Sequence, residues 1–353
     1  MEEQNRVEWI DLVRCIAIIT VVLCHSAEGI YRLNVDFIQN ISKQSKFFGL
    51  SMFTVGRLGV PLFLMITGYL LLDRDYSKEY TLRFWKNNWL RLLVCTQIWI
   101  LIYDVFLMLY SKTELKIITI IQDMLFIHQV NISHIWYMPM ILGMYILIPF
   151  VGKSLKGIDI NTLKFPFVFF SLYSFGFPLL NVINSVLENE PLKLTMSFGF
   201  SGGAYGIYIL TGYLMKKDFL KKYNMGILII VCLISFCCAV GIQIWAYSSY
   251  YTYNIWYDSP FLLITAAIVF EILSRIQKIK MYPVIKLISK YSFAIYLIHF
   301  MIRIICAEYV KLISIILPLK VILLWIITFV LSLICAWVIS KIPLIGKYLL
   351  NIK

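Results

Sequence analysis

Residues 9–30 read WIDLVRCIAIITVVLCHSAEGI, an apolar run that contains a few ionisable side chains. A helix needs about 20 predominantly apolar residues to cross the hydrocarbon core of a bilayer, and this run has that length. The rest of the 353-residue chain is of the same kind, because 61% of its residues are hydrophobic and only 14% are charged. A soluble protein carries roughly 25% charged residues. The composition therefore predicts an all-α, polytopic membrane protein and excludes a soluble globule or a disordered chain.

The same length rule predicts about ten membrane-spanning helices along the chain. The apolar runs are too long and continuous for the strands of an outer-membrane barrel. No Gly/Ser-rich or Pro-rich linker divides the chain, so we expect a single transmembrane domain over residues 1–353. The expected spans are 9–30, 48–72, 87–110, 134–152, 164–183, 200–216, 225–247, 257–275, 291–313 and 319–340.

The distribution of Lys and Arg predicts how the chain is oriented. If the N-terminus is cytoplasmic, the inner segments hold 20 of these residues and the outer loops hold 6. Cytoplasmic loops of membrane proteins collect positive charge, so this bias places both termini in the cytoplasm. The net charge of +13 then reflects topology, and we expect no nucleic-acid partner. The runs 216–222 (KKDFLKK) and 274–280 (SRIQKIK) contribute most to the bias.

Two ionisable residues of the first span fall on one helical face. Arg14 and His25 are eleven positions apart, which is three helical turns with a residual of about 20° and a rise of about 16 Å. Arg14 then lies in the inner half of the bilayer, where Asp11 can pair with it, and His25 lies in the outer half. An imidazole titrates near neutrality, so His25 is a candidate base for proton abstraction. The alternative is a structural ion pair and a hydrogen-bonded core histidine.

Two further arginines are candidates for binding charged or polar groups. Arg57 is expected at the outer end of the second span, where it either snorkels to the interface or holds an anionic or sugar group. Arg91 is expected near the inner surface, where it either snorkels or contacts phosphates.

The fourth span opens with His134 and Trp136, which we expect at the outer face. There they could contact a polar acceptor, although an interfacial aromatic belt explains Trp136 equally well. In the ninth span, His299 and Arg303 are four residues apart, and a structural hydrogen bond is the favoured interpretation of this histidine. The four histidines of the chain lack metal-ligand spacing, so we expect no metal.

Four blocks of the sequence together resemble the acyltransferase family 3 membrane proteins. They are the pattern of Arg14, ten residues and His25, and then RLGVPLFLMITGYLL (57–71), HIWYMPMILGMYILIP (134–149) and YSFAIYLIH (291–299). The blocks occur in the family's order and cover nearly the whole chain. Cys15 stands where the family commonly has Gly, and Thr67 stands where it often has Ser.

The resemblance implies O-acyl transfer, usually of acetyl, from cytoplasmic acyl-CoA to a hydroxyl of a cell-envelope glycan. His25 would then be catalytic and Arg14 its essential partner. Our own hypothesis adds that Arg14, with Arg91 as a helper, receives the phosphates of the acetyl-CoA donor. His134, Arg57 and Trp136 would bind the acceptor, a surface polysaccharide or lipid-linked saccharide. The chain resembles the stand-alone members without an SGNH domain, in the plasma membrane of a bacterium.

Two other functions remain open at this stage. A transporter or flippase for a lipid-linked glycan would also need many spans and intramembrane charges, although no inverted repeats or broken helices point to one. A non-enzymatic membrane sensor or binding domain would bind a ligand without turnover. The sequence leaves open the acceptor, the position acylated, the acyl group, an acyl-enzyme step and the oligomeric state.

Overall fold

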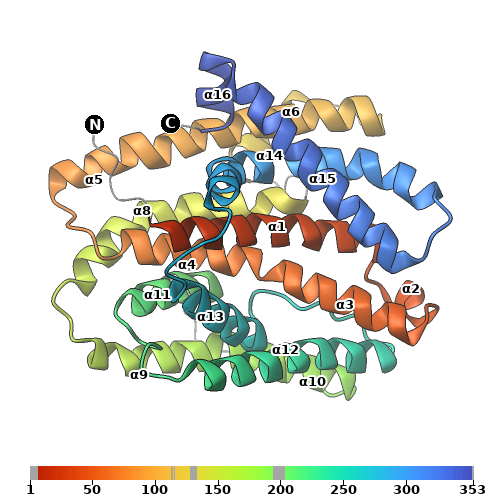
Figure 1. Cartoon of the computed structure of the whole chain (residues 1–353), viewed down its shortest axis with the longest axis horizontal. Coiled ribbons are helices and arrows are strands. Elements are labelled where there is room, and N and C mark those ends of the chain that lie inside the picture. Colours follow the sequence, from red (N-terminus) through yellow and green to blue (C-terminus); the bar gives the residue numbers. More distant parts are fainter. Residues whose placement is uncertain (1–6, 113, 115, 128–132, 194–202, 352–353) are drawn as a thin grey trace.

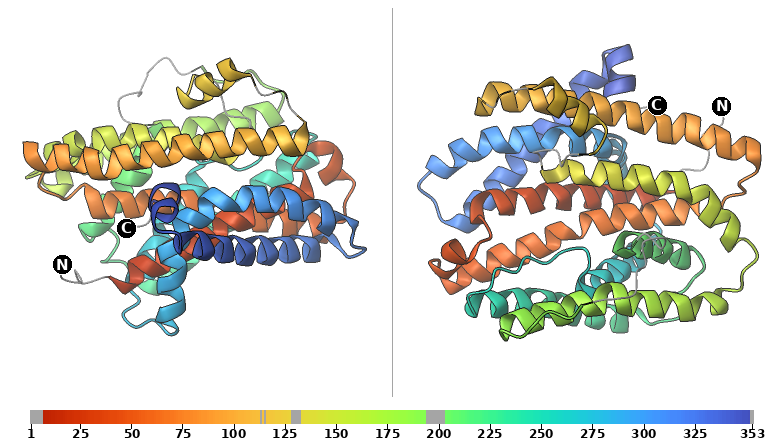
Figure 2. Two further views of the ribbon diagram at one scale, coloured as in Figure 1. Left: turned by 90° about the horizontal axis from the view of Figure 1, so that it is seen from above. Right: turned by 180° about the vertical axis from the view of Figure 1, so that it is seen from behind.

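The structure is a computed structural model that describes residues 7–112, 114, 116–127, 133–193 and 203–351. These residues form helices and connecting loops and no strand, so the predicted all-α class is confirmed. Most of the long helices run side by side along the long axis of the molecule (Figures 1 and 2). Such a bundle satisfies the backbone hydrogen bonds of each segment internally, as the bilayer core requires.

The helices follow one another along the chain with short connections. In order they are α1 (Glu8–Tyr31), α2 (Val35–Gln39), α3 (Lys43–Arg57), α4 (Gly59–Leu71), α5 (Lys78–Phe84), η1 (Trp85–Trp89), α6 (Leu90–Ser111), α7 (Ile117–Met124), η2 (Ser133–Trp136), α8 (Tyr137–Leu155), α9 (Ile160–Ser171), η3 (Leu172–Gly176), α10 (Phe177–Val186), α11 (Gly203–Lys216), α12 (Met225–Ser248), α13 (Pro260–Ser274), α14 (Tyr282–Leu312), α15 (Leu317–Ser340) and α16 (Pro343–Leu349).

Eight helical segments of the described chain are long and apolar enough to cross a membrane. They coincide with eight of the ten expected spans, and several comprise more than one element, such as α3 and α4, or α9, η3 and α10. The other two expected spans, 200–216 and 257–275, fall on α11 and α13, which have only 14 and 15 residues. Residues 200–202 lie outside the described part of the chain.

Helix α1 lies at the centre of the bundle. It packs against α3, α4, α13, α14 and α15, and most of its residues are buried. By contrast, α12 and α15 expose large aliphatic side chains along their length, as lipid-facing helices do. The helix that carries Arg14 and His25 is therefore enclosed by protein, and its polar side chains face neighbouring helices.

The second span is broken where it crosses α1. Helix α3 ends at Arg57 and α4 begins at Gly59. Pro61 has no N–H to donate to the carbonyl of Arg57, which explains a break at this point. The span already begins at Lys43, so the expectation that Arg57 sits at its outer end is wrong, and Arg57 lies halfway along the segment.

Two glycines allow α4 and α11 to cross at very short distance. A Cβ atom added at Gly68 would lie 1.7 Å from the carbonyl oxygen of Ile209, and one added at Gly212 would lie 1.9 Å from that of Met65. Both glycines belong to a TGYL sequence, at 67–70 and 211–214. The two copies therefore pack against each other, as small residues do at close helix crossings in membranes.

Charged segments that were predicted to be cytoplasmic contact one another. Lys217 pairs with Asp73 at 2.7 Å, and Lys156 pairs with Asp75 at 2.9 Å. Arg275 donates hydrogen bonds to backbone carbonyls of the turn between α11 and α12. These contacts gather four of the predicted inner segments at one end of the bundle, the end at which α1 begins (Figure 1).

Candidate active site

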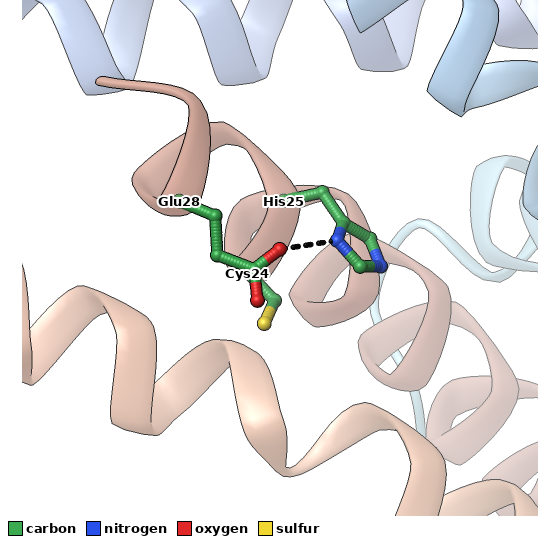
Figure 3. A group of neighbouring side chains, drawn as sticks. All are labelled: Cys24, His25 and Glu28. Carbon is green, nitrogen blue, oxygen red and sulfur yellow. Dashed lines mark hydrogen bonds and ion pairs between the residues drawn. The ribbon is translucent and has the colours of Figure 1, made fainter. Parts of the chain in front are cut away.

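His25 forms a short hydrogen bond with a carboxylate one turn further along α1. Its Nδ1 atom lies 2.6 Å from Oε2 of Glu28, three residues away on the same helix (Figure 3). An ionised carboxylate only accepts hydrogen bonds, so Nδ1 carries the proton and Nε2 keeps a free lone pair. A carboxylate in this position fixes the tautomer and stabilises the imidazolium that forms when Nε2 takes up a proton. His25 and Glu28 thus have the geometry of a general-base dyad.

The second oxygen of Glu28 is bound by Arg57. Arg57 Nη2 donates to Oε1 of Glu28 at 3.0 Å, and Nη1 donates to the hydroxyl of Tyr257 at 3.2 Å. The guanidinium also lies over the rings of Phe53 and Trp256, with 4.6 and 4.4 Å from its central carbon to the ring centroids. Charge-assisted hydrogen bonds and ring contacts of this kind hold a buried charge in one position. Arg57 therefore fixes Glu28, which in turn fixes His25.

Glu28 was not among the residues singled out from the sequence. Its signal was present, because the stretch HSAE places a carboxylate three residues after the candidate base, on the same helical face. An acidic residue at the outer end of a first span also fits ordinary solvation at the membrane surface. Only the structure shows that the side chain turns back toward His25 and Arg57.

Two more imidazoles lie beside His25. The ring centroid of His299 is 5.4 Å from that of His25, and the centroid of His134 is 6.3 Å from it. His299 Nδ1 donates to the carbonyl of Tyr296 at 2.7 Å, which leaves its Nε2 as an acceptor without a partner among the described residues. The hydrogen bond to the backbone agrees with a structural role for His299, but the sequence did not place this ring next to His25.

His134 is 1% exposed, and neither of its ring nitrogens has a hydrogen-bond partner in the described part of the chain. Its ring stacks on Phe300 at 4.6 Å between centroids. The nearby Trp136 packs against Trp256 and Tyr257, with centroid distances of 5.7 and 5.3 Å. The two predicted acceptor residues therefore have different aromatic neighbours: His134 packs against Phe300, and Trp136 packs against Trp256 and Tyr257.

A pocket of about 10 Å³ adjoins the His25 ring, which is room for roughly one water molecule. Aromatic side chains make up much of its wall. It is lined by Val21, Cys24, His25, Gly56, Val60, His134, Trp136, Tyr137, Tyr257 and Tyr296.

A larger cavity of about 360 Å³ contains Arg14 in its lining. Four of its residues also line the pocket beside His25, so the two spaces share one wall. These residues are Val21, Val60, Tyr137 and Tyr296. Arg14 lies 3.4 Å from Asp11, which also accepts a hydrogen bond from Ser289 at 2.7 Å. Two residues of α1 therefore line adjoining spaces: Arg14 lines the larger cavity, and His25 lines the small pocket.

Arg91 does not take part in this arrangement. It lies in the first turn of α6, and it is absent from the lining of both spaces. The asparagines Asn87 and Asn88, which the sequence did not single out, line the larger cavity instead. They belong to the π-helical segment η1, and such segments often occur at functional sites.

Cys24, His25 and Glu28 also offer a possible set of metal ligands, with donor atoms within 4.8 Å of one another (Figure 3). In the described geometry, however, the histidine and the carboxylate are hydrogen-bonded to each other. The Arg57 guanidinium already neutralises the same carboxylate and would repel a second cation. The residues therefore fit a hydrogen-bonded dyad better than a metal centre, and the expected absence of a metal stays a prediction.

A family model for an acyltransferase domain, that of acyltransferase family 3, matches residues 7–341 of the chain. No curated protein and no solved structure matches it.

Proposed function

The chain belongs to acyltransferase family 3 and is a membrane acyltransferase, and from this premise we propose that it is an O-acyltransferase of envelope glycans. The donor is cytoplasmic acyl-CoA, with acetyl as the default acyl group. The acceptor is a hydroxyl of a cell-surface polysaccharide or of a lipid-linked glycan. The enzyme works as a multi-pass protein of the bacterial plasma membrane.

The observation that carries this proposal is the wall shared by the Arg14 cavity and the His25 pocket. A donor whose phosphates bind at the basic inner end can extend its pantetheine arm through the cavity. Its thioester then reaches the imidazole without leaving the protein. Arg14, with a side chain 32% exposed, is accessible for a phosphate contact.

The dyad performs the proton transfers of the reaction. His25 Nε2 removes the proton of the acceptor hydroxyl while the oxygen attacks the thioester carbonyl carbon. The carbonyl electron pair moves to oxygen and gives a tetrahedral intermediate. When the C–O double bond re-forms, the C–S bond breaks, and the imidazolium returns its proton to the departing thiolate. The products are an O-acyl ester and free CoA, and Glu28 stabilises the imidazolium between the two steps.

The acceptor is proposed to approach from the aromatic side of the pocket. Trp136, Trp256 and Tyr257 gather there around Arg57. Aromatic faces stack on sugar rings, which supports a saccharide acceptor. Because Arg57 is 5% exposed and engaged with Glu28, its own contribution is to position the base.

The experiment is to incubate the purified protein with radiolabelled acetyl-CoA and a panel of envelope glycans. We expect label on a glycan as an alkali-labile ester, and no label when the glycan is left out. If the protein, reconstituted in vesicles, moved a lipid-linked glycan across the vesicle membrane without acyl transfer, the proposal would be overturned in favour of a transporter. Ligand binding with neither transfer nor movement would overturn it in favour of a sensor.

A further inference from the structure

Tyr137 stands at the junction of the two spaces. It is the first residue of α8 and lines both the Arg14 cavity and the His25 pocket. Its ring is held edge-on against Tyr296, 5.7 Å between centroids. No hydrogen bond of its hydroxyl group is found among the described residues, whereas the hydroxyl of Tyr296 donates to the carbonyl of His134 at 2.7 Å. Tyr137 therefore brings an uncommitted O–H donor to the place where the two spaces meet.

His134 brings a second uncommitted donor to the same pocket. A neutral imidazole always carries one N–H, and here both nitrogens are buried without a partner in the described chain. A buried polar group without a hydrogen-bond partner destabilises the folded protein, so its presence needs an explanation. Stacking on Phe300 and the hydrogen bond from Tyr296 to its backbone carbonyl hold the residue in place. A bound group that accepts a hydrogen bond would satisfy it.

The helix dipole of α8 favours negative charge near the start of this helix. Tyr137 is the first residue of this 19-residue helix, and no side chain caps it. His134 and Trp136 belong to η2, the 3₁₀ turn directly before it, and all three residues line the pocket. The aligned peptide dipoles of a helix give its N-terminal end a partial positive charge. Developing negative charge in the adjoining pocket is stabilised by this end of the helix.

We propose that the pocket beside His25 is the oxyanion hole of the acyl transfer, with Tyr137 and His134 as its donors. The inference rests on the proposed function. When the acceptor hydroxyl attacks, the carbonyl electron pair of the thioester moves to its oxygen, and the Tyr137 O–H and one His134 N–H donate to that oxygen. The acceptor proton goes to His25 on the other side of the pocket. When the intermediate collapses, the electron pair returns, the C–S bond breaks and both donors are released.

This assignment changes the role expected for His134. The sequence predicted that it binds the acceptor, whereas here it holds the carbonyl oxygen of the donor. A hydrogen-bond donor that is held in place near the developing negative charge raises kcat by about 10²–10³-fold. They have little effect on substrate binding, because the charge is absent from the ground state.

The test compares Tyr137→Phe and His134→Phe with the unmodified enzyme under saturating donor and acceptor. Both variants keep an aromatic ring, so packing against Tyr296 and Phe300 is retained. We expect each to lower kcat about 10²-fold with little change in the KM for acyl-CoA. Binding of a thioether analogue of acyl-CoA, measured by calorimetry, should stay unchanged and serves as the check on folding.

Tyr208→Phe is the matched control, because Tyr208 is a buried tyrosine whose hydroxyl also has no hydrogen-bond partner in the described chain, and it lines neither of the two spaces. We expect it to leave kcat within a few-fold of the unmodified enzyme. If Tyr137→Phe and His134→Phe both retain full kcat while the unmodified enzyme transfers acyl groups, the oxyanion hole is refuted and the proposed function stands. If the unmodified enzyme transfers nothing to any glycan, the proposed function itself has failed.

Discussion

At the scale of single residues, the chemistry depends on one hydrogen bond, 2.6 Å from His25 Nδ1 to Glu28. In Glu28→Gln the neutral amide cannot stabilise an imidazolium, and its NH₂ group can bind Nδ1 and force the proton onto Nε2. We expect kcat to fall about 10²–10⁴-fold with the KM for acyl-CoA largely unchanged. Steady-state kinetics of acyl transfer measures both constants.

The matched control is Glu271→Gln. Glu271 is also a buried carboxylate with an arginine partner, since Arg275 Nε donates to it at 2.8 Å, but it lies near the C-terminal end of α13 and lines neither space of the site. This variant should keep its kcat even if its stability falls. A Glu28→Gln enzyme as fast as the unmodified one would show that the carboxylate does not assist His25.

The cluster of Cys24, His25 and Glu28 leads to a prediction about metals. Because Arg57 already compensates the charge of Glu28, dialysis against EDTA should leave the acyl-transfer rate unchanged, and added Zn²⁺ should not raise it. Loss of activity on chelation, recovery with Zn²⁺ and insensitivity of a Cys24→Ser variant to both treatments would instead assign a metal centre to these residues.

Periodicity was sufficient to place Arg14 and His25 on one face of a helix, because residues eleven apart always fall close together in angle. The partners supplied by other elements could not be found this way. Arg57 reaches Glu28 across 29 residues, and His299 belongs to α14 near the other end of the chain. Such contacts depend on how the helices pack, and a single sequence does not specify this packing.

At the scale of elements, the crossing of α4 and α11 allows a sharp test of packing. In Gly68→Ala the new Cβ would lie 1.7 Å from the Ile209 carbonyl, so the helices must separate. We expect a loss of stability of about 1–3 kcal/mol or more, seen as a lower melting temperature in detergent. Gly241→Ala in α12 is the control, since nothing lies within 4 Å of its added Cβ. Equal melting temperatures for both variants would contradict the close crossing.

The broken second span shows why the ends of a helix are hard to predict from hydropathy alone. Hydropathy began this span at residue 48 and placed Arg57 at its outer end. The helix extends back to Lys43 because Ser42 caps it, its side chain accepting a hydrogen bond from the backbone N–H of Ser45 at 3.2 Å. Ser42 could be recognised as a capping residue in the sequence. The first turn of the helix is polar, however, so a search for apolar runs leaves it out. An apolar window therefore misjudges how deep a residue lies.

At the scale of the whole molecule, the gathered basic segments predict which end faces the cytoplasm. Alkaline phosphatase is active only outside the cytoplasm, so fusions after Lys222 should be inactive and fusions after Tyr250 should be active. These residues lie on either side of α12, which is long and apolar enough to cross the bilayer. The reverse pattern of activity would invert the topology and place the Arg14 cavity away from cytoplasmic acyl-CoA.

Two approaches to one imidazole are the central feature of the molecule. The pocket beside His25 shares part of its lining with the Arg14 cavity, and Trp136 and Tyr257 of the aromatic group near Arg57 line the same pocket. We propose that the donor enters from the cavity and the acceptor from the aromatic group. A donor and an acceptor that start on opposite sides of a membrane can meet at such a site without a soluble domain. The family match, which extends over residues 7–341, agrees with a site built from helices at both ends of the chain.

The single-turnover rate of acyl transfer in His25→Ala, at saturating labelled acetyl-CoA and glycan, tests this central claim most directly. The account predicts a rate at least about 10²-fold below that of the unmodified enzyme, with unchanged binding of a thioether donor analogue. A His25→Ala protein that labels the glycan at the unmodified rate would contradict it.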